Sequence, residues 1–108
     1  MIFQLGTALL DTCVLAILSK ADTYGYVLTQ SVKELFDVSE STLYPVLRRL
    51  QKEACLDTYD RSYQGRNRRY YQITENGTQK FNEYAQEWIV YKNKVDKILF
   101  EEDAYGQK

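Results

Sequence analysis

Apolar residues in the first fifty positions recur at intervals of three and four, the spacing of an α-helix that packs one face against a core. The pattern predicts three helices, over about residues 6–19, 27–36 and 41–50. Their apolar positions are Leu5, Leu9, Leu10, Val14, Ile17 and Leu18 in the first, Val27, Leu28, Val32, Leu35 and Phe36 in the second, and Leu43, Val46, Leu47 and Leu50 in the third.

The start of the third helix depends on Pro45. A hydroxyl side chain at Ser39 or Ser41 can cap this helix, because it accepts a hydrogen bond from a backbone N–H group of the first turn. A proline deep inside a helix removes a hydrogen bond and clashes with the carbonyl four residues earlier, so we expect the regular helix to begin near Thr42. A start at Glu40 predicts instead a local bend at Ser41.

A β-hairpin is predicted after the third helix. Its strands are Leu56–Tyr59 and Arg68–Ile73, joined by a loop over Arg61–Asn67 in which Gly65 permits a positive φ. Alternation along the second strand places Arg68, Tyr70 and Gln72 on one face and Arg69, Tyr71 and Ile73 on the other. We expect the two tyrosines to pack the hairpin against the helices.

A long final helix is predicted from about Glu75 to Phe100, with Thr74 as its cap. Six of its aromatic and aliphatic residues are separated by alternating intervals of three and four positions, which is typical of a coiled-coil seam. A helix of about 25 residues spans roughly 38 Å, more than a body of this size covers, so we expect the excess to pack on a second copy. The alternative is that these residues cover only their own core. The predicted dimer-interface or ligand-binding residues are Phe81, Tyr84, Trp88, Tyr91, Val95 and Ile98.

The charges are unevenly distributed. The net charge is −1, but Arg61–Tyr71 contains four arginines and no acidic residue. An acidic body with one basic strip can dock a single face on phosphate and discourage adsorption elsewhere. The distribution therefore favours a nucleic-acid partner, although the net charge does not.

The composition excludes several other classes of protein. The 108 residues, which suit one domain, include no histidine, so histidine-based catalytic pairs and zinc sites are excluded. We predict no enzyme activity, no metal site and no cofactor. The isolated Cys13 and Cys55 are expected to be reduced, with a redox-sensing role as the alternative. No run of eighteen apolar residues and no secretory signal is apparent, so we expect a cytoplasmic protein that does not contact a membrane.

Two blocks of the sequence resemble the PadR family of bacterial transcriptional regulators. Ser41–Leu50 contains the family's Leu-Tyr-Pro-x-Leu-x-Arg-Leu helix, and Gly65–Gly77 is similar to its Gly-Arg-x-x-x-Tyr-Tyr-x-Leu-Thr-x-x-Gly wing. Tyr24-Gly25-Tyr26 also resembles a family motif, and the similarity extends from about Leu9 to Leu99. The resemblance implies a mainly α winged helix-turn-helix with a small two-stranded β-wing, plus a long C-terminal dimerisation helix. The corresponding segments are 1–74, 75–100 and a flexible tail at 101–108.

The resemblance implies a protein that binds double-stranded DNA as a homodimer, as a repressor on an inverted-repeat operator. Residues near the start of a recognition helix read base edges, and basic side chains contact phosphate. Ser41, Pro45, Arg48 and Lys52 lie opposite the apolar side of the third helix. The predicted DNA-binding residues are Ser39, Ser41, Thr42, Tyr44, Arg48, Arg49, Arg61, Arg66 and Arg68.

Three positions leave alternatives open. Ala54 stands where family members usually have glycine, so the turn after the third helix is expected to be helical or differently closed. Asn67 replaces a usual proline or basic residue in the wing. Trp88 resembles the tryptophan with which some family members stack planar ligands, so a small aromatic effector is a candidate partner. A protein-interaction module that does not read DNA remains the alternative function.

Overall fold

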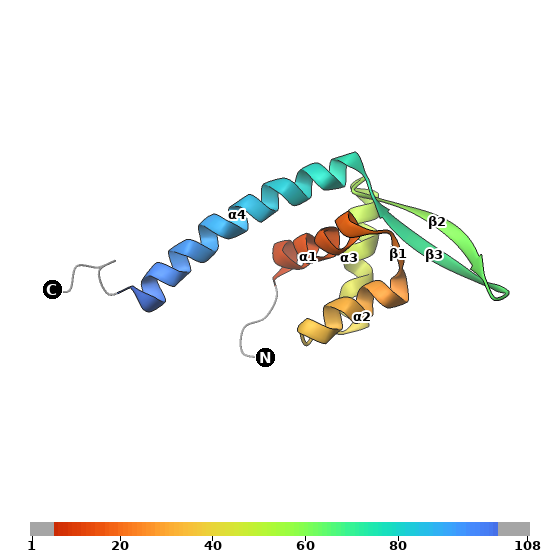
Figure 1. Ribbon diagram of the computed structural model, residues 1–108, viewed down its shortest axis with the longest axis horizontal. Coiled ribbons are helices and arrows are strands. Elements are labelled where there is room, and N and C mark those ends of the chain that lie inside the picture. Colours follow the sequence, from red (N-terminus) through yellow and green to blue (C-terminus); the bar gives the residue numbers. More distant parts are fainter. Residues whose placement is uncertain (1–5, 102–108) are drawn as a thin grey trace.

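The structure, a computed structural model, describes residues 6–101 as four helices and a small antiparallel sheet (Figure 1). The predicted order of three helices, a hairpin and a long helix is confirmed. The predicted flexible tail lies outside the described residues beyond Glu101. The elements are α1 (Thr7–Lys20), β1 (Thr23–Tyr24), α2 (Gly25–Leu35), α3 (Glu40–Lys52), β2 (Leu56–Tyr63), β3 (Arg66–Ile73) and α4 (Glu75–Phe100).

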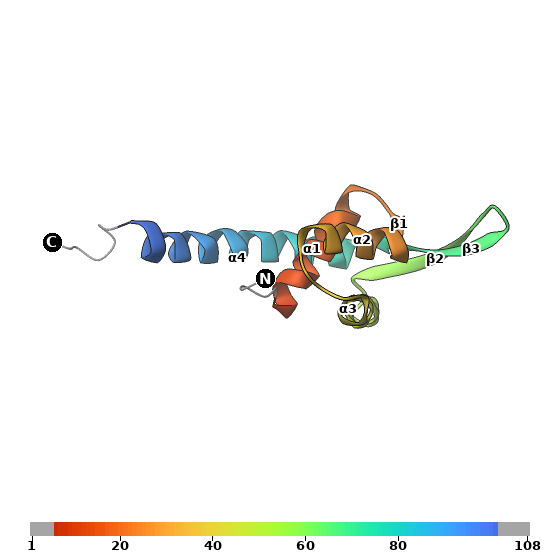
Figure 2. The same cartoon turned by 90° about the horizontal axis from the view of Figure 1, so that it is seen from below.

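The core lies where α1, α2 and α3 meet the base of the hairpin. Helix α4 extends from this body in one direction and the hairpin in the other, so the molecule is 68 Å long and 20 Å thin (Figures 1 and 2). Most of the predicted apolar positions are buried, but Leu35 is 74% exposed. The core residues are Leu10, Val14, Leu15, Leu18, Leu28, Val32, Leu43, Val46, Leu47, Leu50, Cys55, Leu56 and Tyr71.

Helix α3 begins at Glu40, two residues earlier than predicted. Ser39 caps it, because its Oγ accepts a hydrogen bond of 3.3 Å from the Thr42 N–H. Pro45 therefore lies inside the helix. Ser41 is exposed, so water can satisfy the carbonyl that the proline leaves without a helical donor. The bend at Ser41 stays a prediction.

The hairpin is longer than predicted, and its loop is much shorter. Strands β2 and β3 pair from Leu56 opposite Ile73 to Tyr63 opposite Arg66, which leaves a turn of two residues. Both turn residues have positive φ, 51° at Gln64 and 76° at Gly65, as a type I′ turn requires. The predicted seven-residue loop is wrong because the outer half of the hairpin is exposed on both faces and carries no apolar alternation.

A third strand, β1, joins the hairpin to the helices. It was not predicted from the sequence, since two residues cannot show an alternating pattern. Thr23 pairs with Tyr71 and Tyr24 pairs with Tyr70, so the strand order is β1-β3-β2. This pairing fixes the base of the hairpin beside the start of α2.

The turn after α3 corrects the expectation for Ala54. This residue adopts the left-handed conformation, with φ of 63°, so the turn is neither helical nor differently closed. The Ala54 N–H donates to the Gln51 carbonyl at 3.0 Å, and the Cys55 N–H donates to the Leu50 carbonyl at 2.8 Å. These two hydrogen bonds form a Schellman motif, which satisfies the last carbonyls of the helix and offsets the strain at an alanine.

The first turn of α4 packs against Ala54 and Cys55, which follow the end of α3. Thr74 caps α4, because its Oγ1 accepts a hydrogen bond of 2.9 Å from the Gly77 N–H. The same hydroxyl donates to the Ala54 carbonyl at 2.7 Å. A Cβ at Gly77 would overlap the Cys55 carbonyl oxygen and lie 2.9 Å from Cγ1 of Ile73. Only glycine fits this contact without displacement of the backbone.

Gly77→Ala is therefore expected to lower the free energy of unfolding by about 2 kcal/mol or more, because overpacked backbone must move apart. Gly6→Ala is the matched control, since no atom lies within 4 Å of a Cβ at that position. Chemical denaturation followed by circular dichroism measures both variants. Equal stability of the two variants would contradict the contact.

Candidate nucleic-acid interface

Helix α3 has one buried side and one exposed side. Leu43, Val46, Leu47 and Leu50 are at most 6% exposed and pack into the core. The opposite side is in contact with solvent at Ser41, Thr42, Pro45, Arg48 and Lys52. Apart from Pro45 this side is polar or basic, which suits a surface that contacts bases and phosphates.

Three hydroxyl groups gather at the start of α3. Ser39 Oγ lies 2.8 Å from Ser41 Oγ and 3.1 Å from Thr42 Oγ1. All three residues are exposed, so their hydroxyls remain free to exchange these hydrogen bonds for contacts with a partner. Serine and threonine hydroxyls can both donate and accept, which suits base edges and phosphate oxygens alike.

Tyr44 lies at the edge of the exposed side and is half-buried. Its ring approaches the start of α2, where a Cβ at Gly25 would lie 3.6 Å from the Tyr44 hydroxyl. Cε1 of Tyr71 lies at the same distance from that point. Tyr71 itself is 9% exposed, and burial raises the pKa of its hydroxyl. The expectation that Tyr71 packs the hairpin against the helices is confirmed.

Arg49 has a partner inside the protein. Its two terminal nitrogens donate to the two carboxylate oxygens of Asp11, at 2.9 and 2.6 Å. Asp11 is 3% exposed, so the carboxylate of this bidentate pair is shielded from water, whereas the Arg49 side chain is 35% exposed. The hydrogen bond to Asp11 raises the pKa of Arg49. This pairing favours a structural role for Arg49 over a contact with DNA.

The pair belongs to a larger charge network that joins three helices. Lys80 of α4 lies 3.9 Å from Asp11 of α1 and donates a hydrogen bond of 3.0 Å to Glu53, the residue that ends α3. Glu53 also lies 3.9 Å from Arg49. The hydrogen bond from Lys80 lowers the pKa of Glu53. The network thus connects the end of α3 to both α1 and α4.

The other arginines that were predicted to contact DNA differ from Arg49 in their ion pairs. Within residues 6–101, no acidic side chain lies within ion-pair distance of Arg48, Arg61, Arg66 or Arg68. In the same hairpin, Arg69 lies 3.8 Å from Asp60. The positive charge of the four arginines is therefore not neutralised by the described part of the chain. Viewed from below, α3 lies beside the base of the hairpin (Figure 2).

The predicted seam on α4 divides into two parts. Phe81 and Tyr84 are half-buried near α1, whereas Trp88 is 41% exposed and Tyr91 63% exposed. Val95 is half-buried and Ile98 is exposed. Four further exposed apolar residues were not predicted from the sequence, because they lie outside the heptad spacing. These residues are Ile89, Val90, Leu99 and Phe100.

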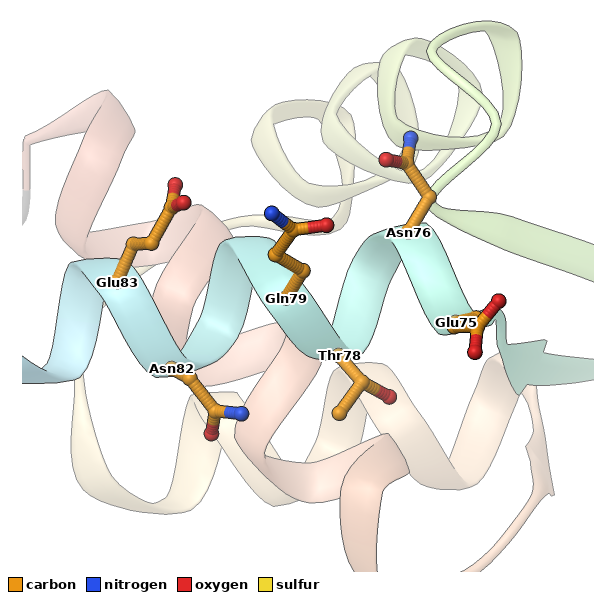
Figure 3. A pocket seen from close by; sticks show the side chains of 6 residues that line it. All are labelled: Glu75, Asn76, Thr78, Gln79, Asn82 and Glu83. Atoms are coloured by element: carbon orange, nitrogen blue, oxygen red, sulfur yellow. The ribbon is translucent and has the colours of Figure 1, made fainter.

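A hollow of about 490 Å³ lies along the first turns of α4 (Figure 3). Its lining residues all have polar or charged side chains and come from α4 alone, as the labelled side chains show. Such a surface is poorly suited to a flat aromatic compound, which needs apolar walls. The lining residues are Glu75, Asn76, Thr78, Gln79, Asn82 and Glu83.

Neither thiol has the surroundings of a reactive cysteine. Burial raises the pKa of Cys13, and it also raises the pKa of Cys55, so both thiols stay protonated near neutral pH. The described residues contain no group of histidine, cysteine or acidic side chains arranged to hold a metal ion. Within residues 6–101, no helix combines the length and apolar character needed to span a bilayer.

Comparison with known proteins decides the family. The model of the transcriptional regulator PadR-like family matches residues 14–83, which include α3 and the whole hairpin. The chain belongs to the PadR-like family of transcriptional regulators. The predicted family and the predicted winged helix-turn-helix fold are both confirmed, and the PadR-like chain is a transcriptional regulator of a DNA-binding family.

Solved PadR-like structures share this arrangement over nearly the whole chain. The protein smu.1704 from Streptococcus mutans UA159 is 40% identical, with 94% of this chain and 95% of that chain covered and a TM-score of 0.87. A PadR-like transcriptional regulator from Bacillus cereus strain ATCC 14579 is 35% identical over 86% of this chain and 93% of its own, with a TM-score of 0.79. A relative from Lysinibacillus sphaericus, described as uncharacterized protein X, is 33% identical over 95 residues, which is 83% of this chain and 87% of the relative.

Arg49→Met is expected to lower the free energy of unfolding by roughly 3 kcal/mol, because it leaves the Asp11 carboxylate buried without its guanidinium partner. Arg48→Met, one residue earlier on the exposed side, should change the stability by less than about 0.5 kcal/mol. Urea denaturation of both variants tests the assignment. If the Arg48 variant is as unstable as the Arg49 variant, the structural role of the Asp11 pair is wrong.

Proposed function

We propose that this PadR-like regulator is a repressor that binds an inverted-repeat operator in double-stranded DNA as a homodimer in the cytoplasm. The observation that carries the proposal is that four arginines, on the exposed side of α3 and on the hairpin, have no ion-pair partner within residues 6–101. These arginines attract phosphate, while the acidic charge elsewhere keeps other surfaces away from DNA.

In the proposed complex, the start of α3 lies in the major groove. The hydroxyl cluster of Ser39, Ser41 and Thr42 is then nearest the base edges, and Tyr44 contacts the groove from the edge of the helix. Arg48, one turn further along, contacts phosphate. The hairpin acts as the wing, with Arg61, Arg66 and Arg68 on the neighbouring backbone or in the minor groove.

The distal half of α4 is the proposed dimer surface, and residues 1–74 the proposed DNA-binding unit. The distal part of α4 extends beyond α1 (Figure 1). Several large apolar side chains from Trp88 onward are exposed. Exposed apolar groups gathered on one helix are typical of an interface with a second copy. A two-fold dimer presents two α3 helices, so the operator half-sites should be separated by about one helical turn, or a multiple of it.

The same surface offers a place for a small aromatic effector. The rings of Trp88 and Tyr91 have centroids 6.2 Å apart and are partly exposed. Where two copies of α4 meet, such rings would provide apolar faces on which a flat compound can stack. A compound that binds there would release DNA only if it changes the relative positions of the two α3 helices.

Arg68→Ala and Ser41→Ala should affect DNA binding in different ways. Removal of a phosphate-binding side chain weakens binding to all sequences and flattens the dependence of affinity on salt by about one unit of slope for each phosphate that is no longer neutralised. Removal of a side chain that reads a base relaxes sequence preference more than it lowers overall affinity. Fluorescence anisotropy on an operator selected from genomic fragments, compared with a scrambled duplex, distinguishes the two. An equal decrease of specificity in both variants would refute the assigned roles.

Trp88→Asp is expected to dissociate the dimer at micromolar concentration, because it places an unpaired charge in an apolar interface. Gln79→Asp adds the same charge on the opposite side of α4 and outside its distal half, so it serves as the control. Sedimentation velocity measures the oligomeric state of each variant. A Trp88→Asp protein that remains as dimeric as the control would place the interface elsewhere.

A further inference from the structure

One face of the hairpin carries tyrosine and arginine side chains in close contact. This face lies opposite the one from which Tyr71 packs into the core, because neighbouring residues of a strand point to opposite faces. The set joins all three strands and extends from β1 to the residue before the turn. We call it the tyrosine–arginine ladder, and it consists of Tyr24, Tyr59, Arg61, Tyr63, Arg68 and Tyr70.

Arg68 occupies the central position of the ladder. Its Cζ lies 4.3 Å from the ring centroid of Tyr24 and 4.0 Å from that of Tyr63. The two tyrosines belong to β1 and β2, the strands on either side of β3, so the guanidinium is held between them. Both distances are within the range of a cation–π contact.

The ladder is anchored to the helical body at its inner end. Tyr24 directly precedes α2, and its ring packs against Tyr70 at 5.6 Å. Tyr70 in turn stacks on Tyr59 at 5.5 Å, and the Tyr59 hydroxyl donates a hydrogen bond of 2.7 Å to Asp22. The position of Arg68 is therefore fixed relative to the helices and not only to the exposed hairpin.

The cation–π contacts leave the N–H groups of the Arg68 guanidinium available for hydrogen bonds. The two rings contact the guanidinium through cation–π interactions, and the N–H groups lie in the guanidinium plane. Within residues 6–101, no hydrogen bond or ion pair occupies these N–H groups. A long side chain that is already ordered loses less conformational entropy when it binds phosphate.

We propose that Tyr24 and Tyr63 are positioning residues, which hold Arg68 in the orientation that contacts a DNA phosphate. Neither tyrosine needs to touch DNA for this role. The inference rests on the proposed DNA-binding function, and it adds to that function two residues which act through a third. It requires that the tyrosines affect DNA affinity only while Arg68 is present.

The test is a double-mutant cycle between Tyr63 and Arg68, measured by fluorescence anisotropy of the full chain on one labelled operator duplex. Tyr63→Leu removes the ring and should lower affinity about tenfold, because the Arg68 side chain of each of two subunits must then be ordered when DNA binds. Tyr63→Phe keeps the ring and should stay within about twofold of the unmodified protein. In an Arg68→Ala background, Tyr63→Leu should have no further effect.

Each outcome of this cycle has a distinct meaning. An unchanged affinity of Tyr63→Leu overturns the proposal. An equal decrease of affinity from Tyr63→Leu with and without Arg68 also overturns it, since the tyrosine would then act only by stiffening the hairpin. If the unmodified protein binds no duplex, the proposed DNA-binding function fails first and the positioning role with it. A decrease that occurs only while Arg68 is present, and that phenylalanine at position 63 avoids, supports the proposal.

Discussion

The contact between the first turn of α4 and the chain that leaves α3 determines how the molecule is assembled. At this point Gly77 lies against the Cys55 carbonyl, and the Thr74 hydroxyl joins the start of α4 to Ala54. The contact fixes the direction of α4 relative to α3. In the proposed dimer, α4 carries the interface and α3 contacts DNA, so this junction sets the separation of the two recognition helices. A side chain at Gly77 would therefore disturb operator spacing as well as stability.

The charge network reinforces the same arrangement. Asp11, Arg49, Lys80 and Glu53 link α1, α3 and α4. Arg48 and Arg49 are neighbours in sequence but differ in their surroundings. The Arg49 guanidinium pairs with Asp11 and holds α3 against α1, whereas Arg48 has no ion-pair partner within residues 6–101. In the proposed dimer, a connection of this kind would couple a change at α4 to the position of α3, which is what release of DNA by an effector would require.

Much of the architecture was predictable because its helices each bury one face, and such burial leaves a period of 3.6 in the sequence. The outer part of the hairpin and β1 could not be predicted. A hairpin that is exposed on both faces has no apolar alternation, and a strand of two residues is too short to show a period. Among the site residues, the ion pair of Arg49 could not be predicted from local pattern. Its partner Asp11 lies 38 positions away, and only the fold brings them together. The αL turn at Ala54 was missed because two hydrogen bonds compensate for a residue poorly suited to it.

The central claim is that the surface of α3 and the hairpin reads a DNA sequence. Fluorescence anisotropy of the purified protein on labelled DNA from upstream of its own coding region, against scrambled DNA of equal length across a salt series, tests it most directly. We expect a preference of about a hundredfold or more that survives near-physiological salt. Equal binding to both duplexes that vanishes with salt, together with no enriched sequence after selection from genomic fragments, would contradict the claim. The basic surface would then serve an acidic protein partner instead.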